Sequence, residues 1–208
     1  MNDYETEEQQ IEALKKWWKE NGTSLIVGLF IGVSALFGWR YYDEQQNVHA
    51  LEASDLYMEV VRNAADDSQE KLVDLSNRLV NDYADTPYAA LVSLLLAKVE
   101  YEKNNVDATI SQLEIALKTA NDDTLKQLAN LRLASVLIEQ GKLTEASEHL
   151  NMEHASVYDA QYAELKGDLY VADGEIEKAR TAYDEAINLL GRTANKWLKL
   201  KRQNLGSV

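Results

Sequence analysis

Histidines and paired carboxylates are the side chains here whose chemistry could support metal binding or acid–base catalysis. His149 and His154 lie five residues apart, beside Glu148 and Glu153, and His49 stands alone. On one helix, a spacing of five places the two imidazoles on different faces, which disfavours a shared metal ion. We therefore interpret both histidines as solvent-exposed polar residues.

The acidic pairs Asp66-Asp67 and Asp122-Asp123 are predicted to lie at helix boundaries. Carboxylates stabilise helix N-termini through the helix dipole, so capping is favoured over catalysis. The sequence has no cysteine, no glycine-rich phosphate loop and no nucleophile or zinc-protease motif. We expect no enzymatic activity, no cofactor and no metal site, so the function must lie in surfaces that helices position.

The composition predicts an all-α protein. Pro87 is the one proline, there are nine glycines, and 46% of the residues are hydrophobic. So few helix-breaking residues favour long helices with a substantial buried core. The net charge of −14 disfavours nucleic acid as a partner, because binding phosphates requires a clustered basic surface.

Residues 160–188 show the clearest repeat, a predicted helical hairpin. Six residues fall at the spacing of the tetratricopeptide pattern: Gly167, Tyr170, Gly174, Ala179, Tyr183 and Ala186. Gly167 and Ala179 are small where the two helices should cross, and the two tyrosines should fill the space around that crossing. Gly174 suits a tight turn that often requires positive φ, and Ala186 leaves room for the next helix.

Earlier segments repeat this hairpin with decreasing fidelity, which predicts a solenoid of stacked hairpins. Ala134, Leu137, Gly141, Ala146 and Leu150 precede the equivalent residues of the last repeat by 33 positions. Residues 88–120 match with about one residue of slip around an Asn104-Asn105 turn, and residues 50–83 keep only helical periodicity. Pro87 is expected to close that first repeat, and residues 192–204 to form a basic capping helix. A generic helical bundle is the alternative, and the 33-residue register argues against it.

Residues 22–39 form an uncharged apolar run that predicts a transmembrane helix over residues 22–42. At about 1.5 Å per residue the run is about 27 Å long, close to the thickness of a bilayer's hydrocarbon core. Aromatic residues on both sides suit the two membrane interfaces. A buried core helix is disfavoured because the run is uniformly apolar. A cleaved signal peptide is disfavoured by four acidic residues among the first eight and by the poor cleavage sequence Gly38-Trp39-Arg40.

Basic residues predict the orientation of this helix. Lys15, Lys16 and Lys19 precede it, whereas Arg40 alone follows closely, so residues 1–21 should be cytoplasmic. Residues 43–208 would then form the repeat domain on the other side of the membrane, and we expect the membrane helix to continue into its first helix. These residues carry 17 Lys/Arg and 29 Asp/Glu, a net charge of −12. Such a surface stays solvated and could attract basic segments of partner proteins.

Ser24, Gly28 and Gly32 recur at every fourth residue of the predicted membrane helix. Small side chains at this spacing allow a second membrane helix to approach closely. Because glycine is common in membrane helices, the stripe is a hypothesis for a packing face.

The whole chain resembles the YfgM family of ancillary SecYEG translocon subunits. The resemblance rests on EALKKWWKENG at residues 12–22, WRYY at 39–42, NDYADTPYAALVSLLLAK at 81–98 and the degenerate repeats. It implies a bacterial inner-membrane protein with a cytoplasmic N-terminus and a periplasmic repeat domain. It also implies association with the SecYEG translocon and with a membrane-anchored periplasmic chaperone of the prolyl-isomerase type.

Through those partners, the family resemblance implies that the chain helps newly translocated client proteins reach periplasmic chaperones. The alternative is a membrane-anchored scaffold for another envelope complex, such as one for cell-wall synthesis. An anchored enzyme is a third class, which the absence of a catalytic motif disfavours.

Overall fold

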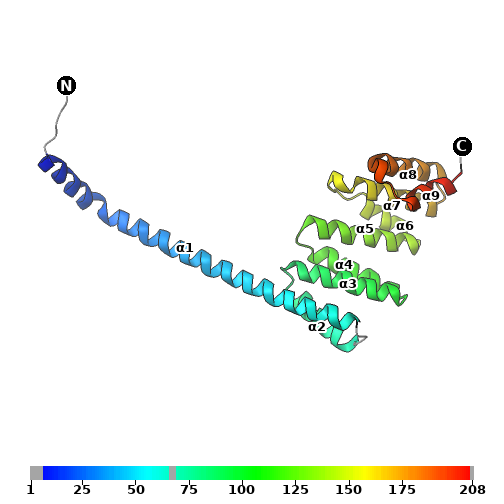
Figure 1. Ribbon diagram of the computed structural model, residues 1–208, viewed down its shortest axis with the longest axis horizontal. Coiled ribbons are helices and arrows are strands. Elements are labelled where there is room, and N and C mark those ends of the chain that lie inside the picture. Colours follow the sequence, from blue (N-terminus) through cyan, green and yellow to red (C-terminus); the bar gives the residue numbers. More distant parts are fainter. Residues whose placement is uncertain (1–6, 66–68, 207–208) are drawn as a thin grey trace, which may run out of the picture. The chain divides into compact units, whose positions relative to one another are not determined.

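The computed structural model describes residues 7–65 and 69–206, and within these ranges it contains helices and turns without a strand (Figure 1). The predicted all-α fold is confirmed. The α-helices are α1 (Glu7–Ala65), α2 (Gln69–Asp82), α3 (Pro87–Glu102), α4 (Val106–Thr119), α5 (Asp123–Glu139), α6 (Leu143–Leu150), α7 (Asp159–Ala172), α8 (Ile176–Leu190) and α9 (Lys196–Asn204). Two short 3₁₀ helices, η1 (Ser156–Tyr158) and η2 (Gly191–Thr193), precede α7 and α9.

The chain forms two compact units, divided between Leu51 and Glu52. In the first unit, α1 holds the uncharged apolar run of residues 22–39. Among the described residues, α1 is the one helix long and apolar enough to cross a membrane. Large apolar side chains such as Phe30 and Phe37 are about 70% exposed along this run, as expected of a helix surrounded by lipid. The α1 helix passes Tyr42 without interruption and ends at Ala65.

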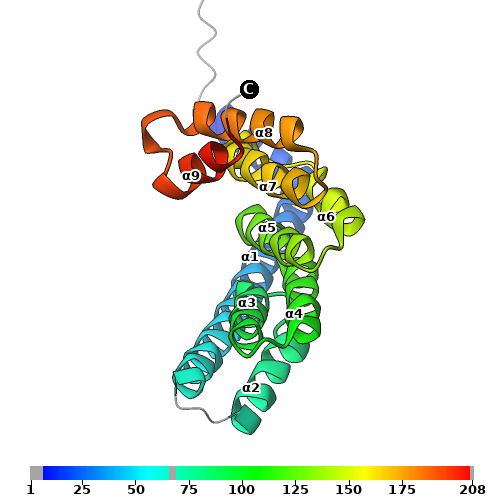
Figure 2. The same cartoon turned by 90° about the vertical axis from the view of Figure 1, so that its right-hand side faces the viewer.

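The second unit contains three successive helical hairpins, α3–α4, α5–α6 and α7–α8, which stack through α4 on α5 and α6 on α7 (Figure 2). Each hairpin turns through one residue with positive φ: Asn104 at 60°, Gly141 at 69° and Gly174 at 79°. After each of these residues, the next backbone N–H donates to the carbonyl five residues earlier, at 2.8–2.9 Å. This is the Schellman ending of a helix, so the three hairpins share one turn geometry.

A further hairpin precedes these three and is built from the C-terminal part of α1 and from α2. Its core contains Ala53, Leu56, Val60, Leu72, Leu75 and Leu79, which also meet Val92 and Leu96 of α3. Pro87 was expected to close this hairpin, but it lies in the first turn of α3. A proline is tolerated there because the first backbone N–H groups of a helix have no intrahelical acceptor. Pro87 therefore opens the α3–α4 hairpin.

The capping helix α9 begins at Lys196, four residues later than expected, because Asn195 caps it by accepting from the Leu198 N–H at 2.8 Å. Leu198 is fully buried against the α7–α8 hairpin. Two basic side chains of α9 also bind carboxylates of the hairpin. Lys201 Nζ lies 2.7 Å from Asp168 and 2.9 Å from Glu164, and Arg202 Nε lies 2.8 Å from Asp184.

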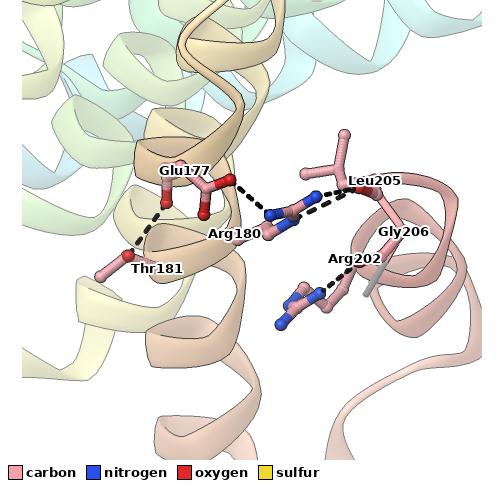
Figure 3. A network of polar contacts seen from close by, with 6 residues as sticks. All are labelled: Glu177, Arg180, Thr181, Arg202, Leu205 and Gly206. Atoms are coloured by element: carbon pink, nitrogen blue, oxygen red, sulfur yellow. Dashed lines mark hydrogen bonds and ion pairs between the residues drawn. The ribbon is translucent and has the colours of Figure 1, made fainter. Parts of the chain in front are cut away.

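The α8 helix also holds the chain that follows α9. Arg180 donates from Nη2 to the Leu205 carbonyl at 2.6 Å and pairs with Glu177, while Arg202 donates to the Gly206 carbonyl (Figure 3). Burial alone would lower the pKa of Lys201, but its bonds to Asp168 and Glu164 outweigh that effect and raise the pKa. The basic character of α9 thus serves its packing against an acidic hairpin.

Candidate protein-binding groove

Gly167 of α7 and Tyr183 of α8, two of the predicted repeat residues, meet where these helices pack. A Cβ added at Gly167 would lie 2.3 Å from Tyr183 Cε1, so this position accepts only glycine while the ring is in place. The ring is held at its far end, because the Tyr183 hydroxyl donates to Asp168 at 2.7 Å. Burial and then the Asp168 carboxylate raise the pKa of Tyr183. The hydroxyl therefore stays protonated and continues to donate.

The other predicted repeat residues surround this crossing. Ala179 and Ala186 are fully buried in a cluster with Leu198 of α9, so Ala186 lies where the next helix packs. Tyr170 is partly buried at the edge of the same cluster, with Lys178 Nζ 5.5 Å from its ring centroid. At this distance the cation can interact favourably with the aromatic face. These residues support the hairpin and leave binding to another surface.

The predicted packing stripe lies on α1, where Ser24, Gly28 and Gly32 are exposed. A Cβ added at either glycine would meet nothing within 4 Å. The stripe is therefore accessible to a second helix, and its use as a packing face stays a prediction.

A groove between α3 and α5, with a volume of about 320 Å³, offers a surface for binding. Each helix contributes one face with the spacing i, i+3, i+4, i+7. From α3 come Leu94, Ala97, Lys98 and Tyr101; from α5 come Arg132, Ser135, Val136 and Glu139. Thr109 and Leu113 of α4 complete the floor. We call this set of residues the α3–α5 groove.

The floor of the α3–α5 groove is apolar and its rim is charged. Leu94, Leu113 and Val136 belong to the main core of the repeat unit and expose only a small part of each side chain. On the rim, Tyr101 donates from its hydroxyl to Glu139 at 2.9 Å. This bond, the nearby negative charge and partial burial together raise the pKa of Tyr101. An apolar floor with a few polar groups is the usual construction of a binding groove.

Comparison with known proteins identifies the family. A model of the tetratricopeptide repeat-like domain matches residues 15–207. Ancillary SecYEG translocon subunits of Haemophilus influenzae and Escherichia coli K12 are each 33% identical to the chain. The first alignment covers 96% of this chain and 97% of the relative, and the second covers 90% of both. The chain belongs to the YfgM-like family of ancillary SecYEG translocon subunits. The corresponding protein of Aggregatibacter actinomycetemcomitans is 30% identical over 96% of this chain.

In this YfgM-like chain, the two C-terminal histidines belong to a polar network that sequence analysis missed. His149 lies near the end of α6, whereas His154 follows that helix. The expectation that both histidines lie on one helix is therefore wrong. Both are partly buried, which corrects the expectation of solvent-exposed side chains. His149 Nδ1 lies 2.7 Å from Asn130 Oδ1, and the His154 ring stacks on Tyr162 with centroids 3.6 Å apart.

Asn130 is the centre of this network and is 2% exposed. Its amide donates to the His149 carbonyl at 2.9 Å and to the Tyr162 hydroxyl at 2.8 Å. Tyr162 in turn donates to Gln127, and burial raises the pKa of Tyr162. The network therefore joins α5, α6 and α7 through satisfied hydrogen bonds, a structural role that accounts for these polar residues.

Of the two acidic pairs, one caps a helix and the other lies outside the described residues. Asp122 accepts from the Leu125 N–H at 2.9 Å and caps α5, as predicted. Asp66 and Asp67 lie outside the described residues. Across residues 7–65 and 69–206, no group of three or more His, Asp or Glu side chains is arranged to hold a metal ion.

Proposed function

We propose that this chain is an ancillary subunit of the SecYEG translocon that binds other proteins through its α3–α5 groove. Its similarity to ancillary SecYEG translocon subunits over nearly the whole length carries this proposal, because the alignment includes both the apolar helix and the hairpins. In the proposed domain organisation, residues 1–21 are cytoplasmic, residues 22–42 cross the inner membrane and residues 43–208 are periplasmic. The excess of lysines before the apolar run supports this orientation.

In the proposed mechanism, the membrane helix keeps the groove near the exit of the translocation channel. Tethering raises the local concentration of a binding site, so a groove with low affinity can still capture emerging chains. The stripe of Ser24, Gly28 and Gly32 is the face we propose for contact with another membrane helix. Captured clients then pass to a periplasmic chaperone of the membrane-anchored prolyl-isomerase type. Stacked hairpins suit this work because they present extended surfaces to other polypeptides.

Co-isolation of the tagged full chain from gently solubilised membranes tests the proposed partners. We expect the SecYEG subunits and a membrane-anchored prolyl isomerase to be enriched over a control with an unrelated single-pass anchor. Replacing Gly28 and Gly32 with leucine should weaken enrichment of SecYEG, because larger side chains prevent close helix approach. Leucine at the exposed positions Val27 and Ile31 is the matched control. Enrichment of cell-wall synthesis enzymes without SecYEG would instead support the scaffold alternative.

A further inference from the structure

We propose that the α3–α5 groove selects segments in which a carboxylate lies beside apolar side chains. This inference rests on the proposed function and adds the chemical class of the bound peptide. The sequence alone favours the opposite preference, because a domain with a net charge of −12 attracts basic segments. The charges that line the groove, however, favour an acidic segment.

The apolar part of the ligand is specified by the floor. Leu94, Leu113 and Val136 are between 2% and 7% exposed, and they form a continuous apolar surface with Ala97. A cavity of about 320 Å³ is at the lower end of the size of ligand pockets, so it suits a few side chains of a peptide. Binding of an apolar side chain there would remove its own surface and that of the floor from water, which favours binding.

The acidic part of the ligand is specified by Arg132. It is exposed on the groove rim, and no hydrogen-bond or ion-pair partner occurs for it in the part of the chain that the structure describes. A guanidinium can bind a carboxylate through two parallel hydrogen bonds. Arg132 therefore offers a ready site for a carboxylate next to the apolar floor.

The remaining charged groups of the groove agree with this assignment. Lys98 adds a second cation, held only loosely by Glu102 at 3.7 Å on the same helix. Glu139 is the one carboxylate among the lining residues, and it already accepts a bond from Tyr101. The lining thus carries two cationic side chains and one carboxylate that is already hydrogen-bonded, within a strongly acidic unit.

Because charges act only over a short distance, the groove should select the peptide more strongly than the acidic surface around it. At physiological ionic strength, interactions between exposed charges are largely screened beyond about 8 Å. A peptide in the groove would contact Arg132 and Lys98 directly, whereas most carboxylates of the unit lie on other helices and faces. The general acidity should therefore influence how fast a peptide arrives, and the groove should determine which peptide stays.

Binding of labelled peptides to the full chain in lipid nanodiscs tests this inference. Three fluorescent peptides share the same apolar residues and length, and carry glutamate, glutamine or lysine at the other positions. We expect fluorescence anisotropy to show that the glutamate peptide binds about tenfold more tightly than the glutamine peptide. The lysine peptide should bind most weakly, and added salt should reduce the glutamate preference.

Charge reversal in the groove gives the matched comparison. Arg132→Glu should remove the glutamate preference and favour the lysine peptide, and Lys98→Glu should do so to a smaller extent. Lys118→Glu is the control, because Lys118 is exposed on α4 and does not line the groove. Arg132 makes no internal bonds among the described residues, so circular dichroism of the Arg132→Glu protein should be unchanged.

Two results would overturn the inference. One is a glutamate peptide that binds no better than the glutamine peptide, whether both bind or neither does. The other is an Arg132→Glu protein that behaves like the Lys118→Glu control. The proposed function would survive either result if clients still crosslink to the groove in cells, so the two failures can be told apart.

Discussion

Replacing Gly167 with valine should lower the free energy of unfolding of the repeat unit by about 3 kcal/mol, the upper part of the range for overpacked cores. The new Cβ would lie 2.3 Å from Tyr183 Cε1 and 2.4 Å from Cδ1, so the helices or the ring must move. The ring cannot move freely, because it is 2% exposed and its hydroxyl is bonded to Asp168. Valine's better helix propensity than glycine recovers only a few tenths of a kcal/mol.

Urea unfolding of the full chain in detergent, followed by far-ultraviolet circular dichroism, measures this loss. Tyr183→Ala supplies the control, because it removes the ring that the new side chain would strike. Tyr183→Ala alone should be destabilising, but adding Gly167→Val to it should cost much less than in the natural sequence. Equal costs in both backgrounds would show that the close approach of α7 and α8 does not limit residue 167.

The second large effect is expected at Asn130, where leucine should cost about 3 kcal/mol of stability. Leucine cannot replace the bonds to the His149 carbonyl, the Tyr162 hydroxyl and His149 Nδ1. The buried partners of Asn130 would then lack part of their hydrogen bonding, which is the costly part of the substitution. Because these partners belong to α6 and α7, coupling between the last two hairpins should weaken too.

The same urea experiment checks this expectation, with Asn188→Leu on the exposed face of α8 as the matched control. The control should change stability by no more than about 0.5 kcal/mol. Asn130→Leu should also broaden the unfolding transition, because repeat proteins lose cooperativity when the interface between repeats weakens. A sharp transition with an unchanged midpoint would contradict the structural role of the network.

The hairpins were predictable because their turns depend on local backbone chemistry. Gly141 and Gly174 both adopt positive φ, and their 33-residue separation marks two equivalent turns. Asn104 fills the same position in the weaker repeat, because asparagine also tolerates a left-handed conformation. The apolar run of α1 was equally clear, since its length and uniformity exceed those of a helix with one buried face.

The histidines were misinterpreted because the end of α6 is not marked by glycine or proline. The helix stops at Leu150, and Asn151 follows with φ near −100°, so His154 lies beyond the helix. Its ring, in the segment between α6 and α7, stacks on Tyr162 of α7, and local periodicity carries no information about such a contact.

The groove could not be predicted because it depends on which faces of α3 and α5 meet. The α3 sequence PYAALVSLLLAKVEYE is apolar on nearly every side, so periodicity does not distinguish its groove face from its core face. The spacing of Lys98 and Tyr101 with Leu94 becomes meaningful only beside Arg132 and Glu139. The pairing of the two helices supplies that information.

Photocrosslinking from the α3–α5 groove in living cells tests the central claim most directly. A photoreactive amino acid at Ser135, in the groove, is compared with one at Lys118, on the exposed surface of α4. During arrested export of a secreted protein, we expect Ser135 to capture the translocating chain and Lys118 to capture far less. Equal capture from both positions, or capture of cell-wall enzymes in place of exported chains, would contradict the account.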